Sequence, residues 1–152
     1  MDGITNAKFG KSQDLYVSDS YHVVMEGDYG GRHFAILCVY GHPCAYIEVR
    51  KDDAIAKCEG HRCDGYCCDC ASICVHGGPT YYGSAQWDET DQRNYIGWDY
   101  AHLGDYCNYG DGIHIDCIDK ESDKHWTTAE ILMDVALAGY GLDTQKEIIY
   151  CG

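Results

Sequence analysis

Cysteines are concentrated between Cys58 and Cys74, a segment that holds six cysteines and one histidine in 17 positions. Thiolates and imidazoles are the ligands that zinc prefers, and a structural zinc site uses four of them with no open position. The C-x-x-C pair of Cys67 and Cys70 is typical of two ligands delivered from one turn. We therefore predict a structural zinc ion held by this pair together with Cys58 and Cys63.

Other ligand sets and other chemistry stay open for this segment. Disulfides or an iron–sulfur cluster would also use several cysteines. A catalytic zinc would need an open coordination position, whereas the local supply of thiolates exceeds four. Metal binding would supply folding free energy that a polar loop lacks, because ordering each residue costs about 1–2 kcal/mol. The alternative ligands are Cys68, Cys74, His61 and His76.

A second group of chemistry-bearing residues is formed by His76, Asp99, His102 and Asp105, in two glycine-containing segments. Imidazoles and carboxylates can activate water, alone or on a metal ion, so the four residues are a candidate hydrolytic site. No nucleophile elbow, phosphate loop or H-E-x-x-H pattern accompanies them. We favour a structural interpretation, in which these side chains bond to backbone amides in tight turns, and we predict that the protein is not an enzyme.

The elements that must position these residues follow from the hydrophobic pattern. The stretch from His33 to Tyr40 is apolar on both faces, which indicates a central strand, and a turn at residues 41–44 leads into a hairpin partner. Gly97 lies within another apolar stretch and indicates a bulge or a close backbone approach. The predicted strands are residues 21–25, 33–40, 45–50 and 113–118, with further short strands at 95–100 and 148–150.

One helix is indicated near the carboxyl end of the sequence. Thr127 can cap the free backbone amides while Glu130 reaches back to it, which is the capping-box pattern. Gly139 or Gly141 can end the helix in a left-handed conformation. The residues expected on its inner face are Ile131, Leu132, Val135 and Leu137.

Together these elements predict a single domain over residues 1–152. We expect an α+β fold, with a mostly antiparallel sheet, one C-terminal helix packed on it and a zinc-stapled, cysteine-rich loop inserted at residues 57–75. A chain of 152 residues is long enough to bury a core of its own.

The charge of the chain is strongly negative, with 25 Asp and Glu against 11 Lys and Arg and a net charge of −14. Such a surface repels nucleic acids and anionic membranes, so we expect no direct contact with either and a basic protein as partner. The other interpretation is that the acidity serves solubility alone. Residues 1–6 have neither a basic nor an apolar signal region, and no apolar run could span a membrane, which predicts a cytoplasmic protein with reduced thiols.

Three motifs resemble those of a family of small uncharacterised proteins of bacteriophages and mobile elements. The family pattern is Gly-His-x-Cys-Gly-Tyr, His-Gly-Gly-Leu-Thr-Tyr and Trp-Ile-Gly-Phe-Asp-Cys-Ala-His-x-Gly-Asp. This chain is similar at residues 41–46, 76–81 and 96–105, and the resemblance covers roughly residues 32 to 138. It departs from the pattern at Pro79, where the family has leucine, and at Tyr100, where it has cysteine.

The resemblance implies a phage origin and a cytoplasmic location in a bacterial host, but no reaction. A short, cysteine-free connection stands in the family where this chain has its cysteine cluster. The metal-binding loop is therefore interpreted as an addition to an older scaffold, and as a candidate recognition surface rather than a catalytic centre.

Two functional hypotheses of different classes follow. The first is a phage counter-defence protein, an acidic zinc-binding inhibitor that binds a host RNA-guided CRISPR effector nuclease and blocks its nucleic-acid loading, because such nucleases hold nucleic acid in positive channels. The second is a binding protein or hydrolase for a nucleotide immune signal, which would use His76, Asp99 and His102 with nearby aromatic faces. A third interpretation, a zinc-bearing structural module of the phage, stays open.

Overall fold

The computed structural model of this protein describes residues 3–17, 20–57, 73–107 and 123–145. The four predicted zinc ligands, the alternatives His61 and Cys68, and the strands predicted at 113–118 and 148–150 lie outside the described residues.

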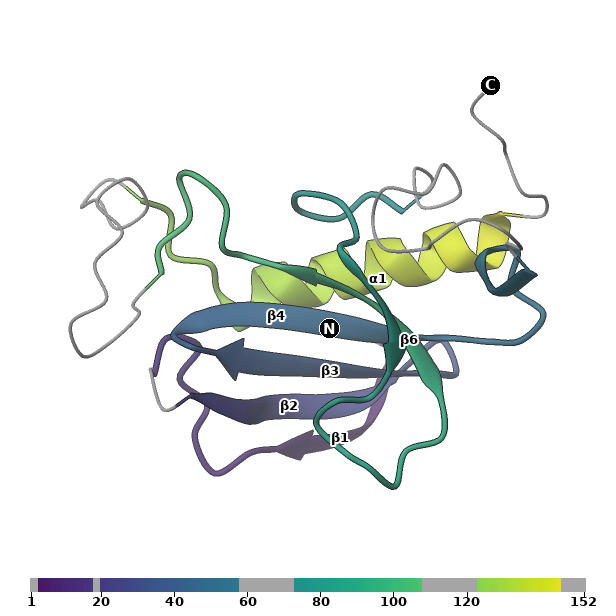
Figure 1. Ribbon diagram of the computed structural model, residues 1–152, viewed down its shortest axis with the longest axis horizontal. Coiled ribbons are helices and arrows are strands. Elements are labelled where there is room, and N and C mark those ends of the chain that lie inside the picture. Colours follow the sequence, from purple (N-terminus) through teal and green to yellow (C-terminus); the bar gives the residue numbers. More distant parts are fainter. Residues whose placement is uncertain (1–2, 18–19, 58–72, 108–122, 146–152) are drawn as a thin grey trace.

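The described chain forms one antiparallel sheet of six strands, in the order β1-β2-β3-β4-β6-β5 (Figure 1). A C-terminal helix packs on one face of it, so the predicted α+β architecture is confirmed. The strand β3 lies inside the sheet and is apolar on both faces, as its sequence predicts. The elements are β1 (Ile4–Phe9), β2 (Tyr21–Tyr29), β3 (Arg32–Val39), β4 (His42–Val49), the 3-10 turn η1 (Ile55–Lys57), β5 (Tyr81–Ser84), β6 (Asn94–Asp99) and α1 (Thr128–Thr144).

Tight turns join the central strands. Gly30 and Gly31 connect β2 to β3, and Tyr40 and Gly41 connect β3 to β4, all four with positive φ angles. Two-residue turns of this kind match the twist of a hairpin, and they allow pairing up to the turn itself. The strand β4 therefore begins at His42, three residues before the predicted start.

The helix α1 begins as predicted but ends later. Thr127 accepts a hydrogen bond from the backbone amide of Glu130, and the Glu130 carboxylate accepts one from the backbone amide of Thr127, which confirms the capping box. The predicted end at Gly139 or Gly141 is wrong, because the helix continues to Thr144. Both glycines are buried, and a methyl group on Gly139 would lie 3.4 Å from Ile47. These glycines allow close packing on the sheet rather than a helix end.

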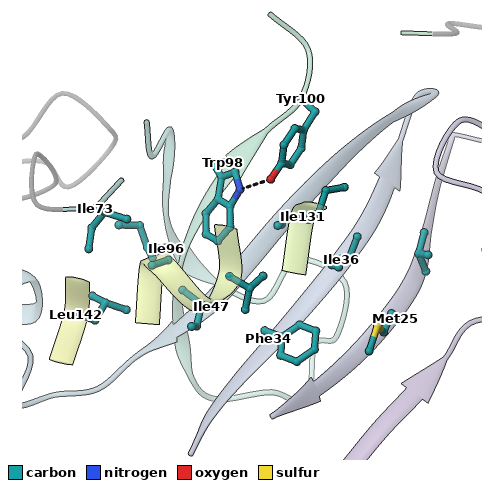
Figure 2. Packing of buried hydrophobic residues seen from close by; sticks show 14 of the residues in the cluster. Met25, Phe34, Ile36, Ile47, Ile73, Ile96, Trp98, Tyr100, Ile131 and Leu142 are labelled. Atoms are coloured by element: carbon teal, nitrogen blue, oxygen red, sulfur yellow. Dashed lines mark hydrogen bonds between the residues drawn. The ribbon is translucent and has the colours of Figure 1, made fainter. Parts of the chain in front are cut away.

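The core lies between α1 and the sheet (Figure 2). Ile131 and Val135 are buried as predicted, but Leu137 is 49% exposed and the prediction that it lies inside is wrong. Ala138 and Leu142 are buried on the inner face instead. The helix packs mainly on β4, and its inner face is the side that carries these two residues. Within the described ranges, α1 and η1 both fall short of the length and apolarity that a membrane span requires.

A buried ion pair holds the C-terminal end of α1. Arg32 is 1% exposed and donates two hydrogen bonds to Asp53, at 2.6 and 2.7 Å, and two to Asp143, at 2.8 and 3.1 Å. Burial alone would lower the pKa of the Arg32 guanidinium, but the bonds to both carboxylates raise it above its usual range. The pair therefore joins β3, the turn after β4 and the last turn of the helix.

The sheet face opposite α1 is covered by aromatic rings. Trp87 lies 4.8 Å from both Tyr46 and Tyr95, measured between ring centroids. The Tyr46 ring crosses directly over Gly97, where an added methyl group would lie 2.5 Å from a ring carbon. The pairing of β4 with β6 is regular at this point, so Gly97 marks a close approach and not a bulge.

Replacing Gly97 by alanine should therefore destabilise the protein by about 1–3 kcal/mol, because the methyl group must displace the Tyr46 ring. Urea denaturation of Gly97→Ala, Tyr46→Ser and the double variant measures this. The cost of Gly97→Ala should fall sharply in the Tyr46→Ser background. An equal cost in both backgrounds would assign it to the strand backbone instead.

Candidate functional site

The four His and Asp residues singled out by the sequence gather at one end of the sheet. Asp99 is the last residue of β6 and pairs with Cys44 of β4. The segment before β5 carries His76, and Thr80 in that segment donates its backbone amide to the Gly97 carbonyl at 2.8 Å. The loop that follows β6 carries the other two residues. The segment before β5 and the loop after β6 therefore meet at this end of the sheet, and they bring the two motifs together.

Asp105 is the centre of this cluster and is 3% exposed. Its Oδ2 accepts hydrogen bonds from Nε2 of His76 at 2.7 Å and from the backbone amide of His102 at 3.0 Å. Its Oδ1 accepts one from the indole of Trp126 at 2.8 Å. One buried carboxylate therefore joins the segment before β5, the loop after β6 and the entry to α1.

The ring of His76 is held between aromatic side chains. It is stacked on Tyr100, with ring centroids 5.2 Å apart and planes at 5°, and its centroid lies 4.5 Å from that of Trp126. Since Nε2 faces Asp105, the tautomer with the proton on Nε2 is favoured. Within the described residues Nδ1 of His76 makes no hydrogen bond.

His102 forms a second pair with Asp99, and its ring centroid lies 5.3 Å from that of His76. Its Nε2 is 3.4 Å from Oδ1 of Asp99. Nε2 of His102 is buried, and it has no hydrogen-bond partner of good geometry among the described residues. The His102 ring fits here because residue 77 is glycine: a methyl group on Gly77 would lie 2.2 Å from Nε2 of His102. The φ angle of Gly77, +68°, also disfavours residues other than glycine.

A second carboxylate, that of the half-buried Asp134, continues the network towards the core. Tyr100 donates its hydroxyl proton to Asp134 of α1 at 2.6 Å and accepts a hydrogen bond from Trp98 at 3.0 Å (Figure 2). Burial raises the pKa of Tyr100 well above its usual range, and the bond to Asp134 raises it further. Tyr100 therefore stays protonated at neutral pH and acts as a hydrogen-bond donor, not as a base.

His42 and Cys44 lie beside Asp99 at the start of β4. Cys44 Sγ is 3.6 Å from Nδ1 of His42, the spacing of a weak sulfur hydrogen bond. Burial raises the pKa of the Cys44 thiol far above its usual range, and burial lowers the pKa of His42. A neutral thiol beside a neutral imidazole is a poor nucleophile, because thiol chemistry needs the thiolate.

The arrangement resolves the predicted site into two His–Asp pairs. In the part of the chain that the structure describes, no three His, Cys, Asp or Glu side chains are placed to hold a metal ion. Of the alternative zinc ligands, Cys74 is described and exposed, and His76 is engaged with Asp105.

Several residues of the site were missed from the sequence. The sequence motifs do not indicate Trp126, whose indole donates to Asp105, or Lys124, whose Nζ lies 3.9 Å from the centroid of the Trp126 ring. The sequence could have indicated Asp134, since it is an acidic residue directly before the buried Val135 on the helix. Polar residues in such positions usually bind a buried partner.

Comparison of the chain with protein-family models, with characterised proteins and with solved structures gives no match. The resemblance to the phage family stays a prediction that rests on the three motifs.

The hydrogen bonds of Asp105 predict a large effect of its replacement. Asp105→Asn should lower the free energy of unfolding by about 2–4 kcal/mol, because the amide turns a donor towards groups that are themselves donors. Asp99→Asn is the matched control and should cost about 1 kcal/mol or less, since the Asp99 side chain is 29% exposed. Equal losses in chemical denaturation would refute the central role of Asp105.

Proposed function

We propose that this protein is a phage counter-defence factor that binds a basic host protein, an RNA-guided CRISPR effector nuclease, and blocks its nucleic-acid loading. The observation that carries the proposal is the net charge of −14. Effector nucleases hold nucleic acid in positive channels, and an acidic protein is steered towards such surfaces. The motif resemblance to phage proteins supports the same setting.

The His and Asp residues of the motifs have structural roles, which is consistent with a binding protein. Asp105 holds three donors from three segments, and Gly77 makes room for the His102 ring. These roles account for the motif residues without a reaction. Exposed carboxylates are available elsewhere, at Asp88 and Glu89 in the loop that covers the outer sheet face.

We further propose that the loop at residues 57–75 carries a structural zinc ion, bound by Cys58, Cys63, Cys67 and Cys70. The support is the number and spacing of its thiolates. The zinc-bearing loop would present a rigid surface to the partner, while the described sheet and helix form a core of their own.

The test is complex formation between the native protein and purified effector nucleases, with and without guide RNA, followed by surface plasmon resonance and DNA cleavage. We expect binding to the guide-free nuclease that weakens at least about tenfold between about 0.05 and 0.5 M salt. Absence of a complex with any effector at low salt would exclude the proposal. Zinc analysis of the same samples should give about one ion per chain, lost in the Cys67→Ser, Cys70→Ser double variant.

A second candidate function is favoured by the geometry of the two His–Asp pairs. With ring centroids 5.3 Å apart, one imidazole could accept a proton while the other donates one, beside the aromatic faces of Tyr100 and Trp126. Lys124 supplies a cation near these rings. Such a site suits hydrolysis or binding of a nucleotide signal.

Incubation with cyclic nucleotides, followed by chromatography, separates cleavage, sequestration and no effect. A hydrolase should lose activity at least about a hundredfold in His76→Gln, whereas Tyr40→Ser, at an exposed turn, should keep it. If no nucleotide is cleaved or depleted, this second function is rejected.

A further inference from the structure

The helix α1 carries apolar side chains on its solvent face. Met133 is 60% exposed, Leu137 49% and Tyr140 69%. Their spacing of four and three residues places them on one stripe, which we call the α1 stripe. The solvent face of a surface helix is normally polar, and adjoining exposed apolar groups mark interaction surfaces.

A hollow of about 390 Å³ lies beside the C-terminal end of the α1 stripe. Tyr29 and Tyr140 contribute aromatic rings to it, and Gly30 leaves it open, since a methyl group on Gly30 would meet nothing within 4 Å. The residues that line the hollow are Gly3, Tyr29, Gly30, Ala136, Tyr140 and Asp143.

The carboxylate of Asp143 lies at the edge of the hollow. Oδ1 of Asp143 accepts both bonds from Arg32, whereas Oδ2 accepts none from the described residues, and the side chain is 51% exposed. Arg32 is also paired with Asp53. Two cations, Arg32 and Arg50, line this region together with three carboxylates, Asp52, Asp53 and Asp143, so one negative charge remains. The whole of α1 carries three carboxylates and no Lys or Arg.

Aromatic rings beside a carboxylate are suited to a long cationic side chain. The aliphatic stem of Lys or Arg can lie against tyrosine rings while its charge reaches a carboxylate. An apolar stripe next to this hollow suits the apolar face of an amphipathic segment. A second copy of this chain is a poor occupant, because each copy carries a charge of −14.

We propose that the α1 stripe and the adjacent hollow bind an amphipathic, basic segment of the partner, with one Lys or Arg side chain in the hollow and its cation on Oδ2 of Asp143. This inference rests on the proposed binding function and assigns it a surface. The apolar residues of the segment pack on Leu137 and Met133, and Tyr140 separates the two parts of the contact.

The probe is a labelled, helical peptide of leucine and arginine, titrated with the full-length protein by fluorescence anisotropy at about 0.15 M salt. Tyr140→Ser and Leu137→Ser should each weaken binding about tenfold, because they remove central apolar contacts. Tyr40→Ser is the matched control, since Tyr40 is 60% exposed on the β3–β4 turn, and it should leave the affinity unchanged. Thermal melts verify that all variants fold.

A second comparison tests the charged contact. Asp143→Asn should weaken binding of the arginine peptide severalfold but have no effect on a peptide in which glutamine replaces arginine. Equal binding by all variants would mean that net charge alone attracts the peptide, which overturns the assignment. A dimer in analytical ultracentrifugation that Tyr140→Ser dissociates would overturn it too, in favour of a second copy.

The same variants separate this inference from the proposed function. A nuclease complex that survives Tyr140→Ser and Asp143→Asn refutes the surface and leaves the function standing. Peptide binding that depends on Tyr140 and Asp143, without a complex with any effector nuclease, refutes the function and leaves the surface standing.

Discussion

The buried carboxylate of Asp105 is the constraint on which the functional end of the molecule depends. A carboxylate at this depth is stable only when donors surround it, and here they come from His76, His102 and Trp126. Since the three donors belong to separate segments, satisfying one charge fixes three loops at once. The position of each imidazole is thus a consequence of where Asp105 is buried.

The C-terminal end of α1 is fixed by a buried cation, Arg32, where the other end depends on a buried carboxylate. Arg32 is buried and bonds to Asp53 and Asp143, so the last helical turn is tied to β3. Because both ends of the helix are anchored by polar contacts, its rotation about its own axis is determined. That rotation buries Ala138 and Leu142 and leaves Leu137 on the solvent face.

The same network limits the chemistry that the site can support. Tyr100 and Cys44 keep their protons because burial raises the pKa of each, so neither is a ready nucleophile or base at neutral pH. A binding function needs none of this reactivity and uses instead the acidity of the surface, which is why the proposed partner is basic.

The sequence by itself determined the strands β2, β3, β4 and β6, the helix start and the capping box, because hydrophobic patterns and local hydrogen bonds act over a few residues. It did not predict β1 and β5, the two edge strands of the sheet. It also singled out His76, Asp99, His102 and Asp105, since their types imply polar contacts. Only the tertiary structure decided which atoms meet, because Asp134 and Trp126 approach the motifs from far along the chain. The helix end was likewise decided by packing, since Gly139 fits against Ile47 and this contact outweighs the local preference of glycine to end a helix.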